Sequence, residues 1–379
     1  MDPERSDRDD ELRGSLRSWA ERNPLGGETD QQALEREAVS LARRLGQEGF
    51  MAYAVPRLYG GIRETVQASN LCVIREELAY FAALADVMFG VQALAAQPVI
   101  IAGTEDQKKK HLPPLARGET IGAFALTESE AGSDASAISL RAKKVSSGYS
   151  LTGNKRFISN AGIAHTYIVF ATTMPDAKAK GISAFIVPAN APGFTVTERT
   201  RLLSPHPIGV LDFNDCFVAQ DGLLGIEGDG LKLALQTLDI LHCTVAASAV
   251  GFARRALAEA ITYSRRRHQF GRAIGEFQSI QFKVAEMAAD LEASRLLVYE
   301  AAAAHDQRQP KFEMKSSIAK LFATEAAQRI VDQALQIHGG NGVVAGHIME
   351  RLYRDVRALR IYEGTSEIQK LLIARELLK

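Results

Sequence analysis

The sequence predicts an α+β protein in which a small β domain lies between two helical domains. Helical periodicity covers about residues 30–112 and returns at residue 231, from where it continues to the C-terminus. Between these blocks, short runs of β-branched and aromatic residues alternate with Gly, Pro, Asn and Ser, as is typical of strands and turns. The predicted domains are a helical domain over residues 1–117, a β domain over 118–230 and a helical bundle over 231–379.

Composition is consistent with a large folded protein that has no affinity for polyanions. The 379 residues are 46% hydrophobic, which is enough for more than one structural unit. The chain carries 45 basic and 45 acidic residues, so no field of one sign surrounds it. The apolar segment Val91–Ile101 is interrupted by polar residues and is too short to cross a bilayer. We therefore expect neither a nucleic-acid partner nor a membrane partner.

The cysteines and the N-terminus indicate a reducing compartment. Cys72, Cys216 and Cys243 are odd in number and show no CxxC spacing, which argues against a disulfide framework and against a zinc site. No metal is expected. The segment from Met1 to Asp10 is charged and lacks the apolar centre of a secretory signal. The expected location is the cytoplasm.

Three helical segments are predicted in the N-terminal domain. A glycine-rich break separates the first from the second, Ala79–Ile101, whose Ala-rich composition is typical of a buried helix. The third begins with Thr104 or Glu105 near its N-cap and ends at Pro113-Pro114. The apolar face of the first helix is formed by Leu34, Ala38, Leu41 and Leu45.

The β domain is predicted from short apolar runs that are bounded by turn residues. Ser146–Gly148 and Thr152–Asn154 have the composition of turns between strands. The predicted strands lie within Ile121–Leu126, Tyr149–Leu151, Tyr167–Thr172, Ile182–Val187 and Gly209–Phe213.

The C-terminal domain is predicted to be an antiparallel four-helix bundle. Its helical periods are long, and the joins near residues 272–275 and 338–342 are short. The predicted helices span 231–267, 277–306, 312–338 and 345–358, and a short helix follows Glu363.

The stretch Ile361–Gln369 is the first candidate for a functional site. Thr365 and Ser366 are good N-caps and lead into the apolar pattern of a last helix. A short loop therefore delivers Glu363 just ahead of that helix. The alternative is a capped helix with a glutamate on its surface.

Three further stretches are candidate ligand sites, and each has a purely structural alternative. In Phe124–Asp134 a strand ends at Thr127 and runs into small hydroxyl residues, whose backbone N–H groups can bind an anion or polar ring or can simply form a β-turn. Lys155–Asn160 places an aromatic residue and a hydroxyl on one strand face, which also suits plain sheet packing. Arg265–Gly271 ends a helix, where Arg267 can grip a phosphate or complement the helix dipole.

Taken together, these motifs resemble the acyl-CoA dehydrogenase family of flavoproteins over nearly the whole chain. The resemblance implies a helical N-terminal domain, a central β-barrel or β-sandwich domain and a C-terminal four-helix bundle. It also implies FAD bound between the subunits of a homotetramer, a dimer of dimers. The motifs, in the family's order, are Pro56…Tyr59-Gly60-Gly61, Gly103–Lys108, Leu126-Thr127-Glu128…Gly132-Ser133-Asp134, Phe157–Asn160, Arg267…Phe270-Gly271, Gln336–Gly340 and Tyr362–Thr365.

The resemblance further implies a role for individual residues. Glu363 matches the catalytic base. The positions that match contacts of the acyl thioester are Ser133, Asp239, His242 and Gly364. The positions that match flavin contacts in the β domain are Phe124, Leu126, Thr127, Gly132, Ser133, Phe157, Ile158 and Ser159. The positions that match contacts with a neighbouring subunit's FAD, its adenosine end or its pyrophosphate are Arg267, Gln269, Phe270, Gln278, Gln336, Ile337, Gly339, Gly340, Thr365, Ser366 and Glu367.

The chemistry of these residues agrees with that assignment. The α-proton of a thioester is very weakly acidic, so its removal needs a positioned base, and burial strengthens a glutamate as a base. The implied function is an FAD-dependent dehydrogenase that forms a trans-2-enoyl thioester and passes electrons to an electron-transfer flavoprotein or another acceptor. One alternative is the same chemistry on a substrate tethered to an acyl-carrier protein. A further alternative is a flavin-bearing scaffold without turnover.

The chain departs from the family's pattern at several positions. Ser129 replaces the usual proline, and Phe157 replaces a tryptophan and so lacks its N–H donor. His242 stands where an arginine is usual, which leaves the substrate open. On one interpretation His242 gives the reaction a titration near neutrality; on the other it fills space in the core. His206, in an unusual loop, fits a structural role as well as a functional one.

Overall fold

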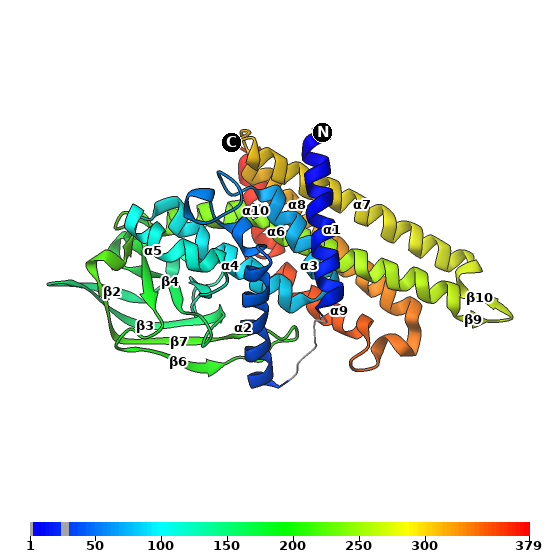
Figure 1. The fold of residues 1–379 in the computed structure, drawn as a ribbon, viewed down its shortest axis with the longest axis horizontal. Coiled ribbons are helices and arrows are strands. Elements are labelled where there is room, and N and C mark those ends of the chain that lie inside the picture. The colour runs from blue at the N-terminus through cyan, green and yellow to red at the C-terminus, as the bar shows by residue number, and fades with distance from the viewer. Residues whose placement is uncertain (1–2, 24–29) are drawn as a thin grey trace. The chain divides into compact units, whose positions relative to one another are not determined.

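The computed structural model describes residues 3–23 and 30–379, in the predicted order of helices, strands and helices (Figure 1). Residues 1, 2 and 24–29, which include the first two residues of the charged N-terminal segment, lie outside the described residues. The chain divides into two compact units. We call them the helical unit (Met1–Gly27, Gln67–Asp86 and Asp239–Lys379) and the sheet unit (Glu28–Val66 and Val87–Leu238). The three-domain boundaries remain a prediction.

The sheet unit is built on an eight-stranded sheet with the strand order β6-β7-β3-β2-β4-β5-β8, and β1 pairs with β4. β1 and β2 run parallel to β4, and the other pairs are antiparallel. All five predicted strands are present. The strands are β1 (Gly122–Ala125), β2 (Arg141–Val145), β3 (Gly148–Ser159), β4 (Thr166–Thr172), β5 (Ile182–Pro188), β6 (Phe194–Arg199), β7 (Ile208–Ala219) and β8 (Leu223–Leu224).

The turn predicted at Thr152–Asn154 is wrong, because these residues lie inside β3. Gly153 has a φ of 136°, and the register with β7 shifts between Leu151 and Gly153. Between the pairs Leu151–Cys216 and Gly153–Phe213, β3 has one residue and β7 has two, so the bulge lies in β7, where Asp215 has a φ of 49°. β3 continues through Gly153 as one long strand. The predicted turn at Ser146–Gly148 is confirmed.

Helices cover the sheet and complete the core of the sheet unit. They are α2 (Gln31–Gln47), most of α4 (Ala83–Ala102) and α5 (Glu105–Ala116). Thr104 caps α5 in a capping box with Gln107, as predicted, but the helix continues through Pro113 and Pro114 to Ala116. The core joins these helices to β4 and β5, for example through Leu115, Ile168 and Ile186.

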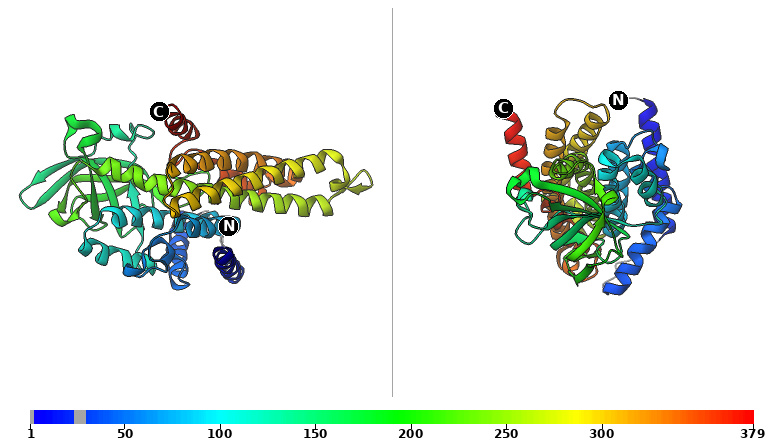
Figure 2. Two further views of the ribbon diagram at one scale, coloured as in Figure 1. Left: turned by 90° about the horizontal axis from the view of Figure 1, so that it is seen from above. Right: turned by 90° about the vertical axis from the view of Figure 1, so that its left-hand side faces the viewer.

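The helical unit contains the C-terminal helices close to their predicted bounds. α7 and α8 run side by side (Figure 2), and a small hairpin, β9 (His268–Gln269) and β10 (Arg272–Ala273), precedes α7. The helices are α1 (Pro3–Arg22), α3 (Ala68–Phe81), most of α6 (Gly230–Arg266), α7 (Gln278–Asp306), α8 (Phe312–His338), α9 (Ile348–Arg357) and α10 (Ser366–Leu377).

An N-terminal helix shares the core of the C-terminal helices. Ala68, Cys72 and Ala79 of α3 lie in one apolar cluster with residues of α6, α7, α8 and α9. The sequence predicted a single helix over Ala79–Ile101, and this prediction is wrong because α3 and α4 are separated at Ala82, whose backbone is extended. α3 and the first residues of α4, up to Asp86, belong to the helical unit.

Two helices are long and apolar enough by composition to cross a bilayer, although the sequence was expected to contain no such segment. α4 and α6 reach the length and hydropathy of a membrane span, with 67% and 72% of their most apolar windows buried inside the protein. Burial of this kind is typical of core helices in a globular domain.

Candidate active site

The loop before α10 adopts the predicted geometry. Thr365 is the N-cap of α10, and its hydroxyl accepts a hydrogen bond from the Ile368 N–H at 3.3 Å. Glu363 and Gly364 precede the cap with φ values of 51° and 86°, both in the left-handed region. Because a residue other than glycine rarely adopts this conformation, the turn at Glu363 must be held by its surroundings.

Two side chains hold the carbonyl groups of this turn. Lys320 Nζ of α8 donates to the Gly364 carbonyl oxygen at 2.5 Å. Gln369 Nε2 of α10 donates to the carbonyls of Glu363 and Gly364 at 3.3 and 3.4 Å, and lies 3.5 Å from His242 Nε2. A Cβ at Gly364 would approach Gln369 Nε2 to 2.7 Å, so a side chain there would displace the amide that holds the turn.

The carboxyl group of Glu363 faces inward. The residue as a whole is partly exposed, but its Oε2 is buried and has no hydrogen-bond partner. Burial raises the pKa of Glu363, the cations Arg75 and Lys320 lower it, and the anion Asp86 raises it. The alternative of a surface glutamate is therefore wrong. Two further buried polar atoms beside this turn, His242 Nδ1 and Gln369 Oε1, also lack partners.

A buried ion pair lies on the α3 side of the turn. Arg75 binds Asp86 through two hydrogen bonds of 2.8 and 3.1 Å and donates to the Thr244 hydroxyl at 3.0 Å. Ser248 also donates to Asp86, at 2.8 Å. Sequence reasoning missed this pair and Lys320, since a single charged residue in a helical pattern ordinarily indicates the solvent face.

His242 and Asp239 lie one turn apart on α6, as predicted. The imidazole of His242 is buried, and burial together with the charge of Lys320 lowers its pKa to about 3. The ring is therefore neutral at physiological pH, and the proposed titration of His242 near neutrality is wrong. Burial also raises the pKa of Asp239 to about 6, with a further contribution from Glu313.

In the sheet unit, Phe124 lies in β1, which ends at Ala125 rather than at Thr127, and the other predicted residues of the 124–134 stretch follow it. The side of this loop toward β3 is held by a buried ion pair, because Lys155 Nζ donates to the Leu126 carbonyl at 2.9 Å and to Glu128 at 2.8 Å. Phe124 and Thr127 are partly buried, Leu126 is buried, and Gly132 and Ser133 are exposed. A Cβ at Gly132 would meet no atom within 4 Å, so the loop has an open side.

The aromatic residue predicted on β3 is held at a bulge. Phe157 has a φ of 55°, the register with β7 shifts between Lys155 and Ile158, and the residue remains 48% exposed. Ile158 is buried, whereas Ser159 is partly exposed and lies 3.1 Å from His206 through its hydroxyl. A large exposed ring beside a hydroxyl is a suitable contact surface for a planar ligand.

Most of the remaining predicted residues follow the ends of α6 and α8, whereas Thr365, Ser366 and Glu367 lie at the start of α10. Tyr263 stacks on His338 with ring centroids 4.4 Å apart, which brings these helix ends together. Phe270 is 94% exposed. Ile337 and Ser366 are buried, and Thr365 is partly buried. The other residues are exposed: Arg267, Gln269, Gln278, Gln336, Gly339, Gly340 and Glu367. The helical unit thus brings Glu363, Gly364 and His242 into contact, but not the hairpin residues.

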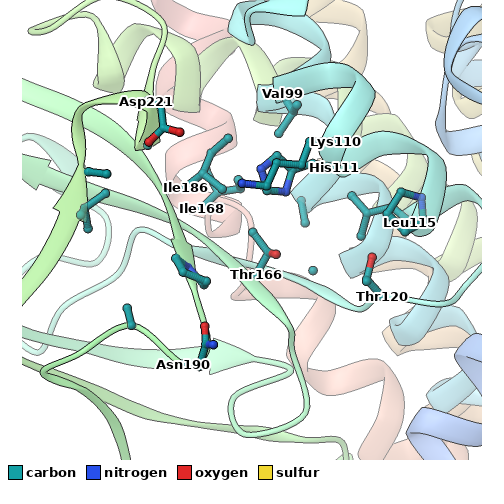
Figure 3. Close-up of a pocket in the computed structure, with 18 of the residues that line it drawn as sticks. Val99, Lys110, His111, Leu115, Thr120, Thr166, Ile168, Ile186, Asn190 and Asp221 are labelled. Carbon is teal, nitrogen blue, oxygen red and sulfur yellow. The ribbon is translucent and has the colours of Figure 1, made fainter. Parts of the chain in front are cut away.

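A cavity of about 610 Å³ lies in the sheet unit between α4, α5 and the strands β1, β4 and β5 (Figure 3). Its walls are mainly apolar, with Lys110 and His111 at one side and Asp221 at another. It contains none of the residues predicted to bind cofactor or substrate. In the described part of the chain, no group of three His, Cys, Asp or Glu side chains is placed to hold a metal ion.

Comparisons with known proteins point to one family over nearly the whole chain. Three domain models of acyl-CoA dehydrogenase match: the N-terminal domain over residues 6–119, the middle domain over 123–216 and the C-terminal domain over 228–378. An acyl-CoA dehydrogenase of Bacillus subtilis is 39% identical over 370 residues, which are 97% of either chain. Butyryl-CoA dehydrogenase of Megasphaera elsdenii superimposes with a TM-score of 0.92 at 36% identity over 98% of both chains. The prolyl acyl carrier protein oxidase AnaB superimposes with a TM-score of 0.84 at 29% identity, over 93% of this chain and 100% of that one.

Proposed function

Because the chain belongs to the acyl-CoA dehydrogenase family and is an oxidoreductase of that type, we propose that Glu363 is the base that starts oxidation of an acyl thioester. The predicted family and fold class are confirmed by the same comparisons. The product of the proposed reaction is the trans-2-enoyl thioester.

One observation carries the assignment of Glu363. Its Oε2 is buried without a partner in a turn whose carbonyls are held by Lys320 and Gln369. A buried polar atom without a partner costs free energy unless a ligand satisfies it. The raised pKa makes the carboxylate a stronger base, and a base of that kind suits the abstraction of a weakly acidic α-proton.

Two further buried polar atoms without partners suit the binding of the thioester from which the proton is removed. His242 Nδ1 and Gln369 Oε1 lie near the Glu363 turn. A neutral His242 can exchange a hydrogen bond with a bound thioester without placing a second charge beside Glu363. Removal of the proton leaves an enolate, and the hydrogen bonds that the site offers stabilise the charge that develops on it.

The chain's residues fit FAD. The exposed ring of Phe157 and the open side of the 128–134 loop offer a stacking surface and backbone donors in the sheet unit. A Cβ at Gly339 or Gly340 would meet no atom within 4 Å, and Arg267 is exposed for a phosphate. FAD, when bound, would supply the acceptor for the β-hydride. The residues proposed to hold it are those that the family resemblance assigned.

We also propose the oligomeric state, the electron acceptor and the cellular location. Phe270, Val343 and Leu371 leave large apolar surfaces exposed on the helical unit, which supports a homotetramer with FAD sites completed by a neighbouring copy. An electron-transfer flavoprotein or another acceptor would reoxidise the cofactor. The proposed location is the cytoplasm.

A second candidate keeps the chemistry and changes the carrier. The prolyl acyl carrier protein oxidase AnaB is similar over nearly the whole chain, and His242 departs from the family's usual arginine. We therefore include a substrate tethered to a carrier protein. The scaffold without turnover has no observation in its favour.

The test is anaerobic bleaching of the purified yellow protein. The flavin absorbance is followed after addition of acyl-CoA thioesters of different chain length and branching, and of the same acyl groups on a carrier protein. Bleaching by acyl-CoA supports the first candidate, and bleaching only by the carrier-bound acyl group supports the second. A flavin-loaded protein that no thioester bleaches contradicts both.

A further inference from the structure

Lys320 is a charged side chain on a helix face that packs into the core. It follows Ala319 on α8 and is fully buried, at 0% exposure. A buried ammonium group is costly unless it is paired and hydrogen-bonded. The fold satisfies it with the carbonyl oxygen of Gly364, at 2.5 Å, so the cation is held against the residue that follows Glu363.

The hydrogen bond from Lys320 is made to a strained part of the backbone. Glu363 and Gly364 are consecutive residues with left-handed φ values of 51° and 86°. For a glutamate this conformation is strained and persists only where the surroundings fix it. The Gly364 carbonyl accepts hydrogen bonds from both α8 and α10, through Lys320 and Gln369.

We propose that Lys320 is a positioning residue for Glu363, which fixes the turn that carries the carboxylate and places a buried positive charge beside it. This inference rests on the proposed function of Glu363 as the base. The charge stabilises the ionised carboxylate, which is the form that accepts a proton. The hydrogen bond to Gly364 keeps the same carboxylate aimed into the site.

The other charges around Lys320 are already engaged or lie outside. On α8, Glu325 accepts a hydrogen bond from Ser366, at 2.6 Å, and pairs with Arg360, at 2.8 Å. On α10, Glu367 is exposed. Of the two groups on α6 and α3, His242 is neutral, and Arg75 is paired with Asp86 but also lowers the pKa of Glu363. Glu363 is the carboxylate whose charge acts most strongly on Lys320.

The charge of Lys320 also depends on Glu363. Burial lowers the pKa of Lys320 to about 8, and among its neighbours Glu363 does most to raise it, ahead of Glu325 and Glu367. An ionised Glu363 and a protonated Lys320 thus favour each other. The pair operates below about pH 8, where Lys320 keeps its proton.

The experiment isolates proton abstraction from oxidation. The flavin-loaded protein is incubated in D₂O with the 3,3-dimethylbutyryl thioester, on whichever carrier supports bleaching. This acyl group has α-hydrogens but no β-hydrogen, so the base can remove an α-proton and return a deuteron without any oxidation. Mass spectrometry gives the exchange rate as a function of pH for the wild type, Lys320→Met, Lys320→Gln and the control Lys315→Met. Lys315 lies on the same helix but pairs with Glu300 near the surface.

Loss of the buried cation should raise the pKa of Glu363. The acid limb of the exchange profile should move to higher pH in both Lys320 variants, and a displacement of one pH unit should lower the rate on that limb about tenfold. Lys320→Gln keeps a donor for Gly364, so its maximal rate should exceed that of Lys320→Met. The control should match the wild type.

The experiment distinguishes a failure of the inference about Lys320 from a failure of the proposed role of Glu363. If Glu363→Gln exchanges as fast as the wild type, the base is wrongly assigned. If Glu363→Gln is inactive but both Lys320 variants retain flavin and overlay the wild-type pH profile, the inference about Lys320 is overturned. Flavin content and the melting temperature identify misfolding of Lys320→Met, in which case the profile of Lys320→Gln decides.

Discussion

His242 shows how the surroundings of a residue decide its chemistry. A histidine ordinarily titrates near neutrality, which made it a candidate pH sensor in the sequence. In the fold its ring is buried and its pKa falls to about 3, with Lys320 adding to the effect of burial. The residue is therefore a neutral hydrogen-bonding group beside Glu363 over the working pH range.

This neutral state predicts a pH-dependent stability difference. In the unfolded chain His242 takes up a proton as pH falls through about 6.5, whereas in the folded chain it does so only near pH 3. The unfolded state thus binds more protons between these values, and the folded state loses stability as pH falls. His242→Gln should abolish this part of the loss. Urea unfolding at about pH 7.5 and about pH 4.5, on either side of the unfolded-state pKa, should show a smaller drop for the variant; equal drops would contradict a buried neutral ring.

The site residues divide into those that a sequence can reveal and those that it cannot. The local pattern of a loop and a cap singled out Glu363 and Thr365, and the family resemblance then gave them their roles. Lys320 was missed because its partner is a backbone carbonyl 44 residues away, which leaves no trace in the spacing. The same is true of Lys155, which supports the loop after β1 from another strand of the sheet.

At the scale of helices and strands, periodicity predicted most bounds and failed where the backbone departs from regular geometry. α7 and α8 match their predicted spans because their apolar period and their flanking breaks agree. Ala82 and Gly153 were misassigned, because an extended residue between two helices and a bulge in the strand that pairs with β3 are set by tertiary packing. Hydrophobic periodicity likewise did not predict that α3 and α8 share one core.

The Arg75–Asp86 pair predicts a strong coupling between α3 and α4. Both groups are buried, and each satisfies the other through two hydrogen bonds. Removal of one partner leaves an uncompensated buried charge, so Arg75→Met and Asp86→Asn should each cost about 3 to 5 kcal/mol in the free energy of unfolding. The double variant should cost much less than the sum.

A double-mutant cycle in urea measures this coupling. Arg117 and Glu119 supply the matched control, because they form a bidentate pair of similar length on the exposed surface. Their coupling should be far smaller than that of the buried pair, because solvent screens an exposed ion pair. Additive effects at Arg75 and Asp86 would show that the buried pair does not act as a unit.

For the whole molecule, we expect assembly and FAD binding to be coupled. The hairpin residue Phe270 is 94% exposed, although burial of an aromatic ring is strongly favourable, so a partner surface is expected to cover it. A ligand that binds only the assembled protein stabilises the assembly by mass action. Phe270→Asp should therefore lower both the sedimentation coefficient and the flavin content.

Leu58→Asp is the matched control for this prediction. Leu58 is also highly exposed, at 79%, but is not among the residues assigned to the cofactor. It should retain wild-type flavin content. A flavin-loaded wild type that sediments as a monomer at micromolar concentration would refute the coupling.

The proposed role of Glu363 is tested most sharply by anaerobic stopped-flow reduction of the flavin with a thioester that bleaches the wild type, compared in the wild type, Glu363→Gln and Glu376→Gln. Glu363→Gln should retain FAD and bind the thioester, yet reduce the flavin slower by at least about 10²- to 10⁴-fold, the usual contribution of a positioned base. Glu376, which lies on α10 and pairs with Lys311 and Lys379, controls for a change of charge on the same helix, and its variant should stay within about threefold of the wild type. Normal bleaching of Glu363→Gln would contradict this role.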